Sequence, residues 1–179
     1  MDEEEAYLRR VEAAKKGDRA SMATLLRGSQ DSIYRFCLSK LRSPALAAEA
    51  TQETALRLIR KIGSFRGDSR FTTWALGIAY NVCRESIRDQ QRRRLVEPLS
   101  DFDPEDTSET QRVEDSESGI SVAMEQLTEK QKTAVTLRYF ESLSISEISQ
   151  VMGVAPGTVK ATLNQAIKKL KLHLPGSEN

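Results

Sequence analysis

Residues 144–171 read SISEISQVMGVAPGTVKATLNQAIKKLK, and this stretch decides the fold of the C-terminal part of the chain. The tetrapeptide SISE at 144–147 fits a capping box, after which apolar residues recur at helical spacing. Gly153 supplies a tight turn, and a second helix is expected from about Pro156 to Leu172. The stretch therefore predicts a helix-turn-helix.

In a helix-turn-helix the second helix enters the major groove of DNA, and residues near its N-terminus meet the base edges. Asn and Gln can pair with adenine edges, whereas Lys reaches guanine or a phosphate. The outer face of this helix is expected to carry Thr158, Lys160, Ala161, Asn164, Gln165 and Lys168. The alternative is a helical hairpin whose polar face is only solvated.

The formal net charge of +1 is distributed unevenly along the chain. Residues 1–95 carry 19 basic and 12 acidic side chains (+7), residues 96–118 carry one and nine (−8), and residues 119–179 carry seven and five (+2). Basic modules suggest a polyanionic partner, which an acidic segment would repel. The segment 96–118 therefore needs a different neighbour.

Helical periodicity on both sides of residues 96–118, without strand-like alternation, predicts an all-α fold. Two small helical domains, 1–95 and 119–179, are expected to flank a flexible acidic linker at 96–118. The expected helices cover about 3–16, 19–41, 43–62 and 71–93 in the first domain, and about 119–126, 129–140, 145–152 and 156–172 in the second. In the first helix, one apolar stripe is expected to contain Tyr7, Leu8, Val11 and Ala14.

The chain has few of the residues that metal sites and histidine-dependent catalysis require. Cys37 and Cys83 lie among apolar residues at helical spacing, which favours buried, reduced thiols, and His173 is the single histidine. We therefore expect no metal site and no histidine-dependent triad. The acidic N-terminus is unlike a secretory signal and no apolar run is long enough to cross a membrane, so we expect a cytoplasmic protein.

A second motif is FTTWALGIAYN at residues 71–81, which is followed by Arg84, Arg88 and the arginine run 92–94. Aromatic rings close to an arginine-rich helix suit single-stranded nucleic acid, because bases stack on rings while arginines hold the backbone. The alternative is that Trp74 and Tyr80 are core aromatics and the arginines only complement the helix C-terminus.

Two blocks of sequence resemble a known family. FRGDSRFTTW at 65–74 and IAYN at 78–81 resemble region two of the ECF (extracytoplasmic function) sigma factors, which belong to the sigma-70 family. Region four of the same family is similar to LTEKQ at 127–131, LRYFE at 137–141, SEI at 146–148 and GTVK at 157–160. The order and spacing of the two blocks agree with that family, and the resemblance covers nearly the whole chain except 96–118.

The resemblance implies a sigma factor, which binds core RNA polymerase and directs promoter recognition, DNA melting and transcription initiation. It implies no catalytic activity and no cofactor. The implied partners are the clamp helices of the largest polymerase subunit, the flap of the second largest subunit, duplex DNA at the −35 element and single-stranded DNA at the −10 element. An anti-sigma factor is a further implied partner, and we expect the chain to be monomeric when free, without membrane insertion.

The resemblance also assigns residues to these contacts. Polymerase binding is expected at Gln52, Glu53, Arg57 and Arg60. Binding of the −10 element, with an extruded base in the loop 63–70, is expected at Phe65, Arg66, Ser69, Arg70, Trp74, Tyr80, Asn81, Arg84 and Arg88. Binding of the −35 element is expected at Thr158, Lys160, Ala161, Asn164, Gln165 and Lys168.

The chain departs from the family pattern in two places. Before Gln52, where the family usually has an acidic run, this chain has LAAE at 46–49. After Lys160, where family members often have Ser-Arg and a further Arg, this chain has ATLNQ. Fewer arginines mean fewer phosphate contacts, so we expect a weaker affinity for duplex DNA and a flatter salt dependence.

Three other classes of protein compete with a sigma factor. A stand-alone helix-turn-helix regulator explains the C-terminal domain but leaves the 71–81 motif and the linker unexplained, and such proteins usually dimerise on palindromic sites. A nuclease or recombinase needs clustered carboxylates or an activated nucleophile, whereas the carboxylates here concentrate in the linker. An interaction protein that binds a sigma antagonist would differ from a sigma factor in not binding DNA.

We hypothesise that the nine acids of the linker at 96–118 mimic nucleic acid inside the basic channels of polymerase. The alternative is an inert spacer whose charge only prevents collapse. Replacing the nine acids with Ser and Gln is expected to change the yields of abortive and full-length transcripts, measured on gels. Unchanged yields of both would rule out the mimicry.

Overall fold

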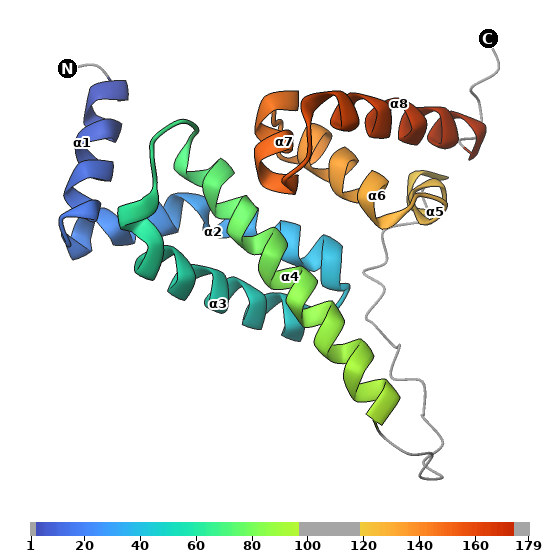
Figure 1. Cartoon of the computed structure of the whole chain (residues 1–179), viewed down its shortest axis with the longest axis horizontal. Helices are drawn as coiled ribbons and strands as arrows, with labels where there is room; N and C mark the ends of the chain where they lie inside the picture. Colours follow the sequence, from blue (N-terminus) through green and yellow to red (C-terminus); the bar gives the residue numbers. More distant parts are fainter. Residues whose placement is uncertain (1–2, 97–118, 174–179) are drawn as a thin grey trace. The chain divides into compact units, whose positions relative to one another are not determined.

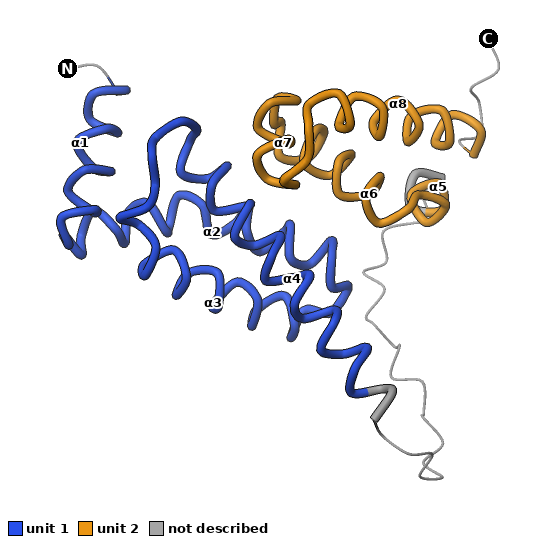
Figure 2. Tube along the Cα trace, in the orientation of Figure 1, with its two compact units in different colours: residues 1–97 blue, residues 98–179 orange. Residues whose placement is uncertain are grey.

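The computed structural model describes residues 3–96 and 119–173 and divides the chain into two compact units, Met1–Glu97 and Pro98–Asn179 (Figure 2). In these described ranges every regular element is a helix, which confirms the predicted all-α fold. The predicted acidic linker at 96–118 lies outside the described residues, apart from Val96 at the end of a helix.

The first unit is built from four α-helices and one short 3-10 helix: α1 (Glu3–Lys15), α2 (Arg19–Leu41), α3 (Pro44–Lys61), η1 (Ile62–Ser64) and α4 (Phe71–Val96). Helices α2, α3 and α4 pack against one another, whereas α1 packs on α2 and η1 (Figure 1). The predicted helices lie at these places, and α4 extends to Val96 rather than to about residue 93.

The core of the first unit lies between α2, α3 and α4. Phe36, Leu58 and Leu76 are completely buried there. Helix α3 contributes a stripe of small residues, and the buried Thr54 satisfies its hydroxyl by donating to the Ala50 carbonyl at 2.7 Å. Small side chains on this stripe allow the three helix backbones to approach one another closely.

Both cysteines belong to this core, as predicted. Cys37 on α2 and Cys83 on α4 are 0% exposed, and neither is in a disulfide. The hydrogen bond with Cys37, together with burial, raises the pKa of the Cys83 thiol. Cys83 therefore stays protonated and unreactive, in a structural role.

The predicted stripe on α1 is partly wrong. Val11 and Ala14 are buried and Tyr7 is half-buried, but Leu8 is 50% exposed. Because α1 rests on α2 and η1 along one narrow seam, a residue beside the seam stays in solvent even when it is apolar. This helix is therefore held by less apolar burial than the other three.

Local capping explains where two of these helices begin. Asp18 accepts a hydrogen bond from the Ser21 amide at 2.8 Å at the start of α2. Ser43 accepts from the Leu46 amide at the start of α3, with Pro44 at the first helical position. A serine followed by a proline at 43–44 predicts such a helix start from the sequence alone, and the structure confirms it.

The second unit contains α5 (Gly119–Glu125), α6 (Glu129–Val135), a π-helical turn η2 (Thr136–Phe140), α7 (Ile145–Met152) and α8 (Pro156–His173). Helix α8 packs against α5, α6 and α7. The capping box predicted at 144–147 is present at the start of α7, and TEKQ at 128–131, which fits the same pattern, forms one at the start of α6. Gly153 ends α7 in the left-handed region at φ 65°, which favours glycine.

The helix predicted at about 129–140 is present over these residues, but its second half is π-helical rather than α-helical. Helix α6 ends at Val135, and the backbone then widens into η2, with the Glu141 amide donating to the Thr136 carbonyl. The Arg138 side chain donates to the Leu143 carbonyl at 2.9 Å, which ties down the end of the turn. Leu143 follows the turn and is 7% exposed, and its amide donates to the Leu137 carbonyl at 3.0 Å, so the end of η2 is joined to the core of the second unit.

The capping box of α7 makes a prediction for stability. Ser144→Ala removes the hydroxyl that accepts from the Glu147 amide, so the free energy of unfolding of the second unit should fall by about 1 kcal/mol. Native-state amide exchange of α7 and α8 measures the change. The matched control is Ser146→Ala on the same helix, where Ser146 is exposed and alanine is the better helix former. An equal loss in both variants would contradict the capping role.

Candidate nucleic-acid interface

Helices α7 and α8 and the turn between them form the predicted helix-turn-helix. Ile148 and Val151 on α7 pack inward, as do Val159 and Leu163 on α8. Helical spacing from Val159 and Leu163 predicts that Ile167 also faces the core, but Ile167 is only half-buried, and Ala166 beside it is completely buried. The buried face of α8 therefore passes through Ala166 rather than Ile167, and the opposite face of the helix lies in solvent.

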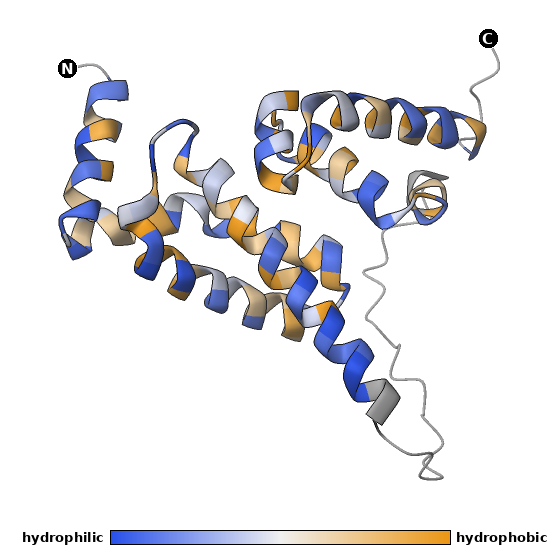
Figure 3. Cartoon of the chain, viewed as in Figure 1, coloured by the Kyte–Doolittle hydropathy of each residue, from blue (hydrophilic) through white to orange (hydrophobic). Residues whose placement is uncertain are grey.

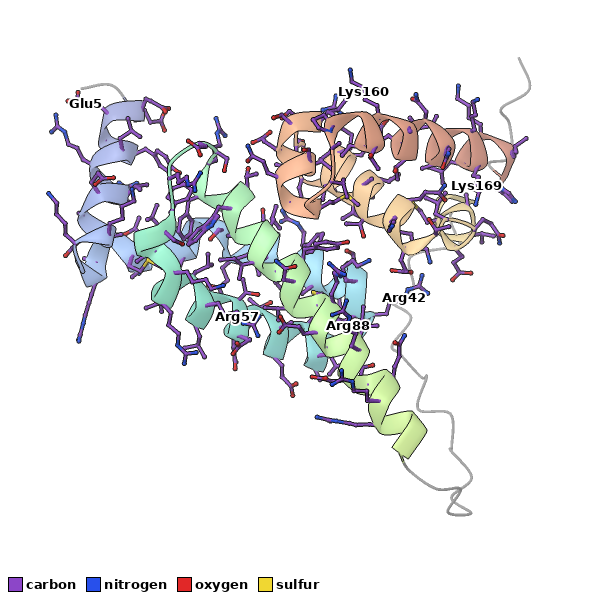
Figure 4. All side chains as sticks on the ribbon, in the orientation of Figure 1. Glu5, Arg42, Arg57, Arg88, Lys160 and Lys169 are labelled. Atoms are coloured by element: carbon purple, nitrogen blue, oxygen red, sulfur yellow. The ribbon has the colours of Figure 1, made fainter. Side chains whose placement is uncertain are left out.

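The outer face of α8 presents every residue that the sequence assigned to it. Thr158, Lys160, Ala161, Asn164, Gln165 and Lys168 are all exposed. Figure 4 shows Lys160 pointing away from the helices of its unit. Within the described part of the chain the amides of Asn164 and Gln165 have no hydrogen-bond partner, so both are available to base edges.

A cluster of three aromatic rings holds the loop between η1 and α4. The Phe65 ring lies 5.9 Å from Phe71 and 5.1 Å from Trp74, measured between centroids, and Phe71 lies 5.7 Å from Trp74. Phe65 precedes the loop and Phe71 begins α4, so the cluster joins the two ends of the loop.

The prediction that Phe65 contacts DNA does not fit its position. Phe65 is 3% exposed, and its ring is enclosed by Phe71 and Trp74. A ligand therefore cannot reach this ring in the present conformation. The ring packs against the start of α4 and so supports the loop from its buried side. On the loop itself, Arg66 and Arg70 are exposed and Ser69 is half-exposed.

Further along α4, one face combines an aromatic ring with polar and basic groups. The half-buried Tyr80 packs edge-on against Phe36 at 6.5 Å, and the Arg84 guanidinium lies 5.5 Å from the Tyr80 ring centroid. Asn81 and Arg88 are exposed on neighbouring turns, and the Asn81 amide donates to the Gly77 carbonyl at 3.1 Å. Figure 3 shows that the C-terminal half of α4 is strongly hydrophilic.

Trp74 and Tyr80 are thus neither fully buried nor fully exposed. Each uses one side of its ring to pack against the core and leaves part of its surface open. Both alternatives weighed for them, core packing and stacking on bases, are therefore compatible with the same position on α4.

The residues expected to bind polymerase lie on α3, but they are not equivalent. Gln52 and Arg60 are exposed. Arg57 donates from Nε to Glu53 at 2.7 Å and, through its two terminal nitrogens, to both carboxylate oxygens of Glu85 on α4 at 3.0 and 2.6 Å. Arg57, labelled in Figure 4, therefore links α3 to α4 rather than extending into solvent.

Two residues on α3 were missed by the sequence prediction. Leu56 and Ile59 are each 48% exposed. On a helix with 100° per residue they share with Gln52 a sector of about 60°. The signal was present in the sequence, because both are large apolar residues off the buried stripe that contains Leu58. Half-exposed apolar residues beside Gln52 and Arg60 suit a protein partner.

Other kinds of site find no support in the described ranges. Among residues 3–96 and 119–173 there is no group of three or more His, Cys, Asp and Glu side chains that could hold a metal ion. No helix in the described part of the chain is long and apolar enough to cross a membrane.

Family models match both units. One, described as Sigma-70 region 2, matches residues 25–93, and another, described as Sigma-70, region 4, matches residues 119–170. The chain is 31% identical over 170 residues to the ECF RNA polymerase sigma factor BldN of Streptomyces coelicolor, covering 92% of this chain and 64% of that protein. It is 30% identical over 168 residues to the RNA polymerase sigma-H factor of Pseudomonas aeruginosa, covering 87% of each.

Two solved structures have a similar fold. CnrH, solved in complex with the cytosolic domain of CnrY, aligns with a TM-score of 0.68 at 18% identity, covering 91% of this chain and 93% of CnrH. The sigma factor RpoE, solved in complex with the anti-sigma factor NepR from Bartonella quintana, aligns with a TM-score of 0.66 at 19% identity, covering 86% of this chain and 96% of RpoE.

The link between Arg57 and Glu85 makes a prediction for pH dependence. Hydrogen bonds from Arg57 lower the pKa of Glu85 below the ordinary value of 4.5. The stabilisation is therefore present above pH 4.5 and is lost as the pH falls through the lowered pKa. Arg57→Gln should return the Glu85 pKa toward its ordinary value, measured by carbon-13 NMR titration of the carboxyl group.

The cost of Arg57→Gln to the free energy of unfolding at neutral pH should stay near 1 kcal/mol or less, because the Glu85 side chain is 52% exposed and water screens the pair. The control is Arg60→Gln, an exposed arginine on the same helix. A Glu85 pKa that responds equally to both variants would show that general charge, and not the hydrogen bonds, causes the shift.

Proposed function

The chain belongs to the ECF sigma factors of the sigma-70 family, and from this premise we propose which of its surfaces carry each step of promoter recognition. As an RNA polymerase sigma factor it directs polymerase to promoters. In the proposed division of labour, 1–95 binds core polymerase and the −10 element, and 119–179 binds the −35 element. The observation that carries the assignment is the presence of two separate polar faces, one on each unit, on α4 and on α8.

Helix α8 reads the −35 element as duplex DNA. Asn164 and Gln165 are exposed amides that can each form two hydrogen bonds with an adenine edge. Lys160 and Lys168 supply positive charge along the same face, and Thr158 lies at its start. The helix has lysines and no arginine on this face, so phosphate contacts are made by single charges rather than by bidentate forks. Base discrimination therefore rests mainly on the two amides.

The loop between η1 and α4 captures the −10 element as a single strand. Arg66 and Arg70 on the loop and Arg84 and Arg88 on α4 contribute phosphate contacts. Asn81 supplies an amide beside the half-exposed rings of Trp74 and Tyr80, and Ser69 supplies a hydroxyl on the loop. An extruded base costs a few kcal/mol of unstacking, and these contacts offset that cost without a covalent step.

The half-exposed face of α3 binds the clamp helices of the largest polymerase subunit. Leu56 and Ile59 form the apolar centre of this face, with Gln52 and Arg60 at its edge. Such a centre with a polar rim is the usual arrangement of a protein interface. Because Arg57 is already engaged with Glu53 and Glu85, it orients α3 on α4 instead of making the main contact. The second unit binds the flap of the second largest subunit.

The proposed factor needs no cofactor and performs no chemistry of its own, since strand capture supplies the free energy for melting. It works in the cytoplasm and is monomeric when free. An anti-sigma protein is a further proposed partner, by analogy with RpoE and NepR. The exposed apolar pair Leu56 and Ile59 supports this partner, because a free chain gains by having such a surface covered.

The test is run-off transcription with purified core polymerase, the purified chain and a library of genomic fragments, followed by sequencing of transcript starts. New starts that depend on the chain and share motifs near −35 and −10 are the expected result. Tight DNA binding without core polymerase, combined with no new starts, would overturn the proposal in favour of a stand-alone regulator.

Variants on α3 and on α8 test the proposed polymerase surface and the proposed DNA surface separately. The double variant Leu56→Ala, Ile59→Ala should weaken core binding by at least about tenfold, through loss of buried apolar area, and leave duplex binding by α8 unchanged. Leu8→Ala is the matched control, because Leu8 is exposed to a similar degree on α1.

On α8, Asn164→Ala should retain core binding and relax base preference in the −35 motif. Lys160→Ala should weaken duplex binding to all sequences alike and reduce the salt slope by about one.

A further inference from the structure

The first turn of α4 donates a hydrogen bond to a helix that is distant in sequence. The Phe71 amide, the first of α4, donates to the Tyr7 hydroxyl on α1 at 2.7 Å, across 64 positions of sequence. The preceding residue, Arg70, has only donors on its side chain and so cannot cap the helix itself. Without Tyr7 this amide at the end of the loop would depend on water.

Helix α1 also contacts the other end of the loop, where the loop leaves η1. Helix α1 packs on η1, which leads into the loop, while its Tyr7 holds the residue that ends the loop. Figure 1 shows α1 beside η1 at this end of the first unit. Within the loop the Ser69 hydroxyl donates to the Arg70 carbonyl at 3.4 Å, a distance that adds little rigidity. The position of the loop is therefore set largely by its two ends.

The N-terminal half of α1 is sparsely packed, so the hydrogen bond of Tyr7 contributes much of its attachment. The buried residues of α1 are Val11 and Ala14, both in its C-terminal half. Next to Tyr7 lies an open cavity of about 670 Å³ between α1, α2 and the start of α4, with Leu25 and Phe71 in its wall. On that side α1 borders the cavity, so the Tyr7 hydroxyl is a main contact between the N-terminal half of α1 and the start of α4.

We propose that Tyr7 is a positioning residue for promoter melting: its hydroxyl holds the start of α4, and thereby the loop with Arg66 and Arg70, in the geometry that captures the −10 strand. The inference rests on the proposed function of that loop. Tyr7 touches no DNA in this scheme. It acts through the Phe71 amide, so its loss moves a binding surface that lies elsewhere.

The test uses holoenzyme assembled from core polymerase and the full chain. Its probe is a labelled single strand that carries the −10 element of a promoter mapped by the run-off experiment. Tyr7→Phe should weaken strand binding by roughly three- to tenfold, the range expected for one lost hydrogen bond, and leave core affinity unchanged. Amide exchange at Phe71 should accelerate by a similar factor.

Two controls separate positioning from general stability. Tyr34→Phe makes the same chemical change at a half-buried tyrosine of α2 and should leave both readouts unchanged. Val11→Ala loosens the packing seam of α1 but keeps the Tyr7 hydroxyl, so its effect on strand binding should be smaller than that of Tyr7→Phe.

Two outcomes would overturn the inference while leaving the sigma-factor function intact: faster exchange at Phe71 with normal strand binding, or an equal loss in Val11→Ala. Failure of the wild-type holoenzyme to retain the strand would instead overturn the assignment of the loop to the −10 element, and the inference with it.

Discussion

The burial of one face of α4 is the constraint on which the first unit depends. Leu76, Ala79 and Cys83 are completely buried against neighbouring helices, which fixes the rotation of α4 about its own axis. Once that rotation is fixed, Arg84 and Arg88 must face solvent. The proposed nucleic-acid face is thus a consequence of the core, and any change that rotates α4 would also move its arginines.

Contacts at two places on α4 connect this helix to its neighbours. At its start, Tyr7 and the ring of Phe65 hold the loop, and in its middle Glu85 receives two hydrogen bonds from Arg57 on α3. The proposed polymerase surface on α3 and the proposed strand-binding surface on α4 therefore belong to one packed body. A partner that binds α3 therefore meets a helix whose orientation relative to the proposed strand-binding surface is already fixed.

Much of the fold follows from interactions within four residues of sequence. The capping boxes at Thr128 and Ser144, the helix start at Ser43 and the turn at Gly153 are local, and all were predictable. The exposed face of α8 was predictable for the same reason, since helical periodicity alone separates its polar from its apolar side. The change from α-helical to π-helical hydrogen bonding at η2 was not predicted.

The sequence by itself determined the all-α fold, the order of the helices, the charge distribution and the family. The tertiary structure decided which side chains are available to a partner: it buries Phe65 and exposes Leu56. It also joins Arg57 to Glu85 and Tyr7 to Phe71. The last two pairs are separated by 28 and 64 positions. Local periodicity carries no information about such pairs, because the packing of whole helices brings them together.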